Sequence, residues 1–223
     1  MKNRSLPGAA GSAPIPKGEK KRIAASGVVL MVLCVFLLVA LIVVLLTSAP
    51  KPGPEDMALR YAQAQLVLDW AEMDELDPVD LAGDCRSGYV AQYGTLANAL
   101  SRLSDSDGRD YRDISDLWNQ RKSQRSEELT ALYGENYEIT VEVVQNSNYL
   151  GSDLPRIVAE LSQTPSLGSQ TPLGELCDVE RADQVRKIIL ACQVGDESSR
   201  ASILVVRIDG QWYPLSATWE MEE

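Results

Sequence analysis

The most distinctive feature of the hydropathy pattern is an unbroken apolar run near the N-terminus. Residues 28–46 include no polar side chain over nineteen positions, when Cys34 is counted as apolar. A helix of this length spans about 28 Å, which matches the hydrocarbon thickness of a bilayer. A helix in a soluble core would show polar residues at a 3.6-residue period, and none occurs here. The pattern predicts a transmembrane helix within residues 23–48.

Beyond this run, apolar positions first recur at helical spacing. A helix is predicted to begin near Pro54, and its apolar face comprises Leu59, Ala62, Leu66, Trp70 and Met73. A second helix is predicted over residues 89–103. A third is predicted over residues 111–133, where Gly134 supplies a C-terminal stop. The polar middle of this third helix, residues 119–128, is expected to face water.

The period then changes from helical to alternating. Tyr137, Ile139, Val141 and Val143 alternate with polar residues, which indicates a half-buried strand. A short helix over residues 154–161 is followed by two strands over residues 185–194 and 201–208, joined by a polar turn. Asp209-Gly210 predicts a tight type I′ hairpin turn. A helical half followed by antiparallel strands predicts an α+β domain, with helices packed on one face of a curved sheet.

Charge divides the chain into a basic tail and an acidic remainder. Residues 1–22 carry six basic residues and one acidic residue, a net charge of +5, whereas the remaining residues carry −16. The positive-inside rule therefore predicts a cytoplasmic tail over residues 1–22 and an extracytoplasmic domain over residues 55–223. Residues 49–54 are rich in proline and form an expected stiff linker.

A cleaved signal peptide is the alternative to a permanent anchor. The apolar core is longer than the usual 7–15 residues, and the small residues at 47–49 are followed by Pro50. Cys34 lies behind Val32-Leu33, where a lipoprotein signal would need a small residue. These features favour an uncleaved signal anchor.

Three cysteines fall in the predicted outer domain: Cys85, Cys177 and Cys192. They allow three different disulfides, and their spacing does not decide among them. An oxidising exterior permits one disulfide, while buried thiols are equally ordinary. No pair approaches the C-x-x-C spacing of metal and redox sites.

Several classes of chemistry are excluded by composition. The chain contains no histidine, which excludes Ser-His-Asp and Cys-His catalysis and histidine-containing zinc sites. No dinucleotide-binding, P-loop or G-x-S-x-G motif occurs, so no cofactor is expected. The acidic outer domain excludes nucleic-acid binding. Arg121, Lys122 and Arg125 are interpreted as a solvated helix face, with binding of an anionic envelope polymer as the alternative.

Carboxylates are the remaining candidates for chemistry. They cluster at the end of the first predicted helix and in the loop after it: Asp69, Glu72, Asp74, Glu75, Asp77, Asp80 and Asp84. Asp69 is the best single candidate for an acid–base group, because Trp70 is adjacent and Tyr61 lies two turns earlier. The favoured interpretation is instead a solvated acidic loop in which Asp69 caps or pairs locally. At about 100° around the helix from Trp70, Asp69 should lie at the rim of any pocket.

Two further motifs are candidates for a binding site. Asp105-Ser106-Asp107-Gly108 resembles part of a calcium-binding loop, but placing Gly108 at position 6 of a standard loop puts Leu103 and Ile114 at ligand positions. A turn and a helix cap are therefore expected. Trp212 and Tyr213 are expected in the core. Trp219 is compatible with either core or ligand contact.

The order of predicted elements resembles the cystatin-like fold of the nuclear transport factor family. The segments 132–141 (LYGENYEITV) and 206–213 (VRIDGQWY) are similar to those of membrane-anchored proteins of Gram-positive bacteria. The resemblance covers roughly residues 56–219, and its motifs are structural. It implies the fold without an activity, since this fold includes isomerases, dehydratases, ligand carriers and interaction modules.

These observations lead to three hypotheses for function. The first is a single-pass membrane protein whose outer domain binds an envelope protein or a small ligand without catalysis. The second is a cavity enzyme of the same fold with an Asp or Tyr acid–base group. The third is a structural module of a membrane complex. An open pocket with convergent polar groups favours an enzyme, whereas a space filled by apolar side chains favours an interaction module.

Overall fold

The computed structural model describes residues 35, 37–39 and 51–221, and the chain divides into two compact units between Pro50 and Lys51. Residues 35 and 37–39 are helical. The tail over residues 1–22 and the rest of the predicted transmembrane segment lie outside the described residues. Within the described part, no helix has the length and apolarity needed to cross a membrane.

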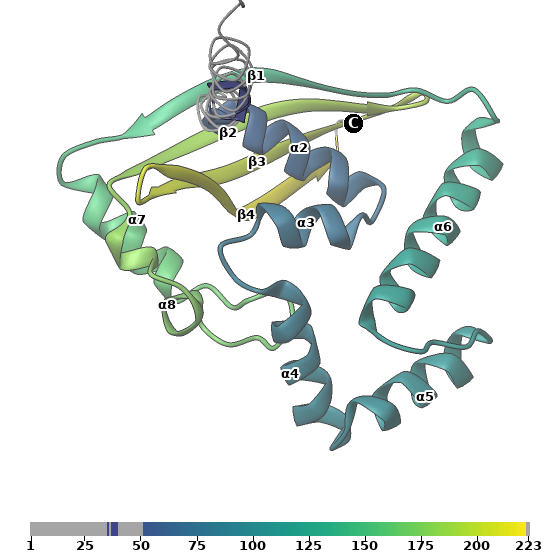
Figure 1. Ribbon diagram of the computed structural model, residues 1–223. Coiled ribbons are helices and arrows are strands. Elements are labelled where there is room, and N and C mark those ends of the chain that lie inside the picture. Colours follow the sequence, from purple (N-terminus) through teal and green to yellow (C-terminus); the bar gives the residue numbers. More distant parts are fainter. Residues whose placement is uncertain (1–34, 36, 40–50, 222–223) are drawn as a thin grey trace, which may run out of the picture. The chain divides into compact units, whose positions relative to one another are not determined.

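The second unit begins with five helices and ends with a sheet (Figure 1). The helices of the first half are α2 (Pro54–Leu66), α3 (Trp70–Leu76), α4 (Leu81–Tyr93), α5 (Leu96–Asp107) and α6 (Ile114–Tyr133). The second half comprises β1 (Ile139–Tyr149), α7 (Asp153–Ser162), α8 (Leu173–Leu176), a 3-10 turn (Val179–Arg181), β2 (Gln184–Val194), β3 (Glu197–Ile208) and β4 (Gln211–Met221). This order confirms the predicted α+β class.

All four strands pair antiparallel in chain order, β1-β2-β3-β4. The β3–β4 turn confirms the hairpin prediction, because Asp209 (φ 52°) and Gly210 (φ 76°) both have positive φ. Two strands are longer than predicted. β1 continues through its polar second half to Tyr149, and β3 already begins at Glu197, just after Gly195 at φ 57°.

The main core lies between α2 and the sheet. Met57, Ala58, Tyr61 and Ala62 of α2 belong to one buried cluster with Ile188, Leu190, Ala201 and Ile203 of β2 and β3. Val185 and Val206 project from the opposite face, because side chains alternate along a strand. They form a second cluster with Ile157, Val158 and Leu161 of α7. A smaller layer thus covers one end of the second face.

The first two predicted helices are each broken in the structure, and both predictions were wrong in this respect. The first ends at Leu66 and resumes at Trp70, because Leu68 adopts a positive φ of 54° and Asp69 caps the new helix. The second is split at Gly94 (φ 80°), after which Thr95 caps α5 by accepting a hydrogen bond from the Asn98 N–H.

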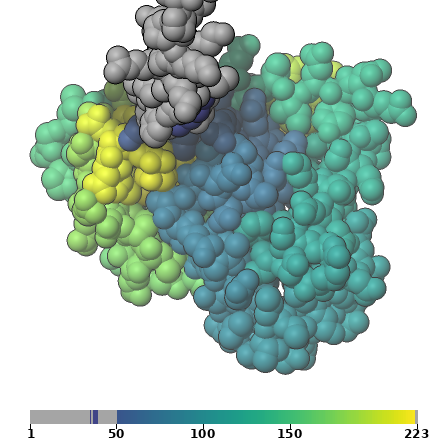
Figure 2. Space-filling view, viewed as in Figure 1, coloured from purple at the N-terminus to yellow at the C-terminus, as the bar shows by residue number. Residues whose placement is uncertain are grey.

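The third predicted helix is confirmed. Asp113 caps α6 at its start, and Gly134 ends it at a φ of 88°. Together α4, α5 and α6 enclose a small cluster of buried side chains, Leu100, Tyr111 and Leu117. Figure 2 shows these helices as a continuous lobe of blue to teal atoms.

The three cysteines of this unit are free thiols, so the described residues contain no disulfide among them. Cys85 and Cys192 are buried and Cys177 is half-buried. Burial raises the pKa of each thiol to about 11. The thiols therefore serve as small apolar side chains at neutral pH.

Candidate functional site

A cavity of about 210 Å³ lies beside α2, between the loop that joins α3 to α4 and strand β4. Its polar lining comes from residues far apart in the chain: Tyr61, Gln65, Asp77, Asp84, Thr164, Ser166 and Ser216. Its apolar lining includes Val79, Leu81, Leu173 and Leu215. The space is therefore open and has convergent polar groups, and apolar side chains do not fill it.

Asp77 is the ionisable group in this cavity whose pKa is raised towards neutral pH. It follows the last residue of α3, and its Oδ1 accepts a hydrogen bond of 2.9 Å from the Val79 N–H. Burial raises the pKa of the Asp77 carboxyl to about 6, and the nearby carboxylates of Asp74 and Asp84 add to the rise. The Val79 hydrogen bond opposes the rise without cancelling it. Asp77 therefore exchanges its proton near neutral pH.

Tyr61 supplies a phenol to the same cavity. It lies on α2, where it is only 2% exposed. Burial raises the pKa of Tyr61 to about 12, and the negative charge of Asp77 contributes, while hydrogen bonding with Gln65 acts in the other direction. Tyr61 therefore stays protonated and keeps an O–H donor available.

Asp84 has a structural part in shaping the cavity. It is 6% exposed on α4, and its Oδ2 accepts hydrogen bonds from the Gly168 N–H (3.0 Å) and the Ser169 N–H (3.1 Å). The Ser169 hydroxyl donates to its other oxygen. A side chain at Gly168 would place Cβ 2.4 Å from the backbone nitrogen of Cys85, so this loop lies directly against α4. The carboxylate thus fixes the loop over residues 164–171 at the cavity.

The electrostatic character of the cavity is acidic. Two carboxyl groups, Asp77 and Asp84, line it, and neither lysine nor arginine is among its lining residues. An anion placed there would meet like charge in a poorly solvated site. The arrangement suits a neutral hydrogen-bonding group or a cation.

Asp69, the candidate singled out from the sequence, is not among the residues that line this cavity. It caps α3 by accepting a hydrogen bond of 3.3 Å from the Glu72 N–H, and it pairs with Lys122 of α6. The expected capping by Asp69 is confirmed, although its ionic partner Lys122 is 53 residues away. The expectation of a solvated acidic loop is wrong, because most of this segment forms α3 and the start of α4, where Asp84 is buried. Asp77 belongs to the same acidic segment but carried only one weak signal, its position before Pro78 at the end of a helix.

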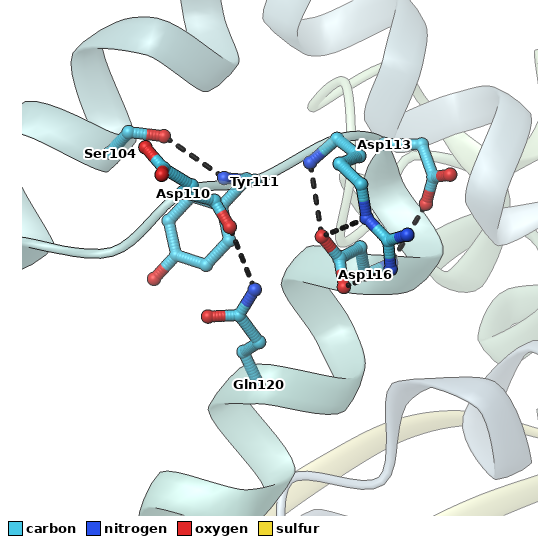
Figure 3. A network of polar contacts seen from close by, with 7 residues as sticks. Ser104, Asp110, Tyr111, Asp113, Asp116 and Gln120 are labelled. Atoms are coloured by element: carbon cyan, nitrogen blue, oxygen red, sulfur yellow. Dashed lines mark hydrogen bonds and ion pairs between the residues drawn. The ribbon is translucent and has the colours of Figure 1, made fainter.

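The predicted helix cap is confirmed at Gly108, which has the left-handed conformation, but residues 105–107 form the end of α5 and not a turn. Acidic residues nearby cap and pair, as Figure 3 shows. Asp116 accepts hydrogen bonds from the backbone and guanidinium of Arg112, and Asp113 accepts one from the Asp116 N–H. Among the described residues, no cluster of three or more metal-ligating side chains occurs.

The basic cluster on α6 also makes local contacts. Arg121 pairs with Asp107 at 3.4 Å, and Lys122 pairs with Asp69. The Arg125 Nε donates to the Leu66 carbonyl at 3.2 Å. The polar middle of α6 thus contacts the ends of α2 and α5 on one side.

The three aromatic residues of β4 differ in their surroundings. Trp212 packs against the main core and Tyr213 against the second cluster, as predicted. The guanidinium carbons of Arg186 and Arg207 lie 5.6 and 5.8 Å from the Trp212 ring centre. Trp219 donates from Nε1 to the Gln65 Oε1 at 2.9 Å and lines a second, apolar depression.

Comparison of the chain with family models, with curated proteins and with solved structures yields no match. The functional proposal therefore rests on the sequence and on the geometry of the site.

Proposed function

We propose that this chain is a single-pass membrane protein whose extracytoplasmic domain, of cystatin-like fold, binds a small molecule in the cavity of Tyr61 and Asp77. The observation that supports binding most directly is that a buried phenol and a half-buried carboxyl line the same open cavity. Tyr61 hydrogen-bonds with Gln65 and Asp77 accepts from the Val79 N–H, but each side chain can form a further hydrogen bond. A ligand in the cavity can use this remaining capacity.

The ligand's polar group is an amine or a hydroxyl. With a pKa of about 6, Asp77 is mainly ionised at neutral pH, so it pairs favourably with a cationic ammonium group. A carboxylate or phosphate would face two acids and no basic residue in the lining. Tyr61 can donate its O–H or accept a hydrogen bond, which suits either polar group.

The direct test compares small ligands that differ only in head group. Butylamine, butanol and butyrate are titrated calorimetrically into the full chain held in lipid nanodiscs, with empty nanodiscs as the blank. Butylamine should bind most tightly, and Asp77→Asn should weaken it about tenfold to a hundredfold, the worth of a charged hydrogen bond. Asp80→Asn is the matched control, because Asp80 is exposed and caps α4. Equal binding of butyrate, or an unchanged affinity in Asp77→Asn, would overturn the proposal.

A second candidate function is acid–base catalysis in the same cavity. The observation that favours it is the Asp77 pKa of about 6, since a general base works best when its pKa lies near the working pH. Tyr61 would then donate a hydrogen bond to the oxygen of a carbonyl substrate. Deuterium exchange at the α-carbons of cyclohexanone in D₂O tests this directly. If wild type exchanges deuterium no faster than Asp77→Asn, catalysis is refuted and ligand binding remains the proposed function.

The membrane topology has its own test. The proposed orientation follows from the basic residues before the apolar run and the acidic domain after it. Protease added to intact protoplasts should degrade residues 55–223 and spare the N-terminal tail. Full protection of the domain would contradict the orientation.

A further inference from the structure

An apolar groove of about 500 Å³ lies next to the cavity. One wall comes from the end of α2 and from α3, with Leu66, Leu68, Trp70 and Met73, and Trp219 comes from β4. Trp70 is held by stacking on Trp118, at 6.1 Å between ring centres. Arg125 and Glu128 of α6, which pair with each other, complete the lining.

Two side chains line both spaces: Gln65 and Leu167. Gln65 is held from the groove side by the Trp219 indole N–H. Leu167 is 47% exposed, an unusual exposure for a leucine beside a cavity. It belongs to the loop that Asp84 ties to α4. The cavity and the groove are therefore neighbours that share an amide and an exposed leucine in their linings.

The groove also exposes apolar surface at a backbone cost. Leu68 has a φ of 54°, a conformation that a residue with a bulky side chain rarely adopts, and it is still 36% exposed. Glycine or asparagine would fit this backbone better, so the conformation costs free energy at a side chain that stays partly exposed. An exposed leucine at such a position is instead suited to contact a ligand.

We propose that the cavity and the groove form one site for an amphiphile, whose amine or hydroxyl head group meets Asp77 and Tyr61 while its apolar chain lies along Trp70 and Trp219. This inference rests on the proposed function of the cavity. The cavity alone is smaller than the roughly 300–1,000 Å³ of typical ligand sites, and the groove brings the combined volume into that range. The polar end and the apolar end of the site also match the two ends of such a molecule.

The contribution of the ligand's alkyl chain to the binding affinity follows from the burial of its apolar surface. Each methylene buried from water strengthens binding about fourfold. If the groove continues the cavity, affinity should keep rising with the length of the ligand's alkyl chain after the cavity is full. If the two are separate, affinity should level off or fall once the alkyl chain is longer than the cavity.

The experiment titrates the n-alkylamines from propylamine to octylamine into the full chain in lipid nanodiscs. Binding is followed by tryptophan fluorescence, because all four tryptophans lie in residues 70–219 and none in the apolar run. We expect about a fourfold gain per methylene through octylamine. Leu68→Asn, which fits the left-handed backbone, should reduce that gain. Leu132→Asn is the matched control, since Leu132 is a more exposed leucine on α6 that is not among the groove residues.

Each outcome has a distinct meaning. A sustained gain that Leu68→Asn reduces and Leu132→Asn preserves supports the joined site. An affinity that stops rising after butylamine, or a gain unaffected by Leu68→Asn, overturns it while the proposed function of the cavity stands. If no amine of any length binds, both the joined site and the proposed function fail.

Discussion

Burial of Asp77 should destabilise the domain at neutral pH, and Asp77→Asn should recover that stability. The folded-state pKa is about 6, compared with 3.8 for an ordinary aspartate. Each unit of pKa difference corresponds to 1.36 kcal/mol, so the ionised carboxylate lowers the free energy of unfolding by roughly 2–3 kcal/mol. Asparagine keeps an oxygen that can accept the Val79 N–H hydrogen bond but carries no charge.

The sign of the effect sets its pH window. Well below pH 3.8 the carboxyl is protonated in both folded and unfolded chains, so there is no penalty. Between about pH 4 and 6 the unfolded chain loses its proton first, and stability falls as pH rises. Above pH 6 the penalty is complete. Wild type should therefore approach the stability of Asp77→Asn at about pH 3 and unfold at a lower temperature at pH 7.5.

Thermal unfolding followed by tryptophan fluorescence measures this difference in the outer domain. A gain of about 2 kcal/mol corresponds to roughly 4–8 °C in Tm for a domain of this size. Glu75→Gln is the matched control, because Glu75 is an exposed carboxylate on the neighbouring helix α3. An Asp77→Asn variant that is less stable than wild type at pH 7.5, or whose difference does not vary with pH, would refute the reasoning.

Three further substitutions test the fold around the site. Gly210→Val should lower the free energy of unfolding by about 1–3 kcal/mol in denaturant titration because φ is +76°, whereas Gly210→Asn should lower it less; equal losses would contradict the turn assignment. Asp84→Asn should cost roughly 1–3 kcal/mol and expose the loop over residues 164–171 to limited proteolysis, and an uncut loop would show that the carboxylate does not hold it. Asp69→Asn should change Tm little, because asparagine caps helices equally well and the pair with Lys122 is partly exposed to solvent; a large loss would imply a role beyond capping.

The periodic elements were predictable from the sequence because their side chains meet one environment along each face. The helix α6 was predicted with a small error at its start, and three strands were predicted at the right places, although β1 and β3 are longer than their patterns indicated. The Asp209-Gly210 turn was predicted from its φ requirement, but the extent of β4 after it was not predicted. The two helix breaks were missed for a specific reason. Leu68-Asp69 and Gly94-Thr95 interrupt the backbone hydrogen bonding without interrupting the apolar spacing, so periodicity does not register them.

The break at Leu68 also explains why the wrong carboxylate was singled out. In a continuous helix, Asp69 would project beside Trp70 and two turns from Tyr61. The positive φ at Leu68 ends α2, and Asp69 becomes the cap of a new helix whose direction is set by other contacts. The carboxyl group that lines the cavity with Tyr61 is then Asp77, at the far end of that new helix.

The environment that makes Asp77 reactive comes from distant parts of the chain, and for this reason no local pattern encodes it. Its pKa is raised by burial, and it lines the cavity together with a loop some ninety residues later. Asp84 holds that loop in place through hydrogen bonds at a sequence separation of 84 and 85 residues. The same loop supplies Leu167, the side chain shared by the cavity and the groove. Loss of the Asp84 contact should therefore bring the Asp77 pKa back towards its ordinary value and weaken amine binding together. A pH titration of Asp84→Asn stability that still shows a transition near pH 6 would separate the two effects and leave the loop without this role.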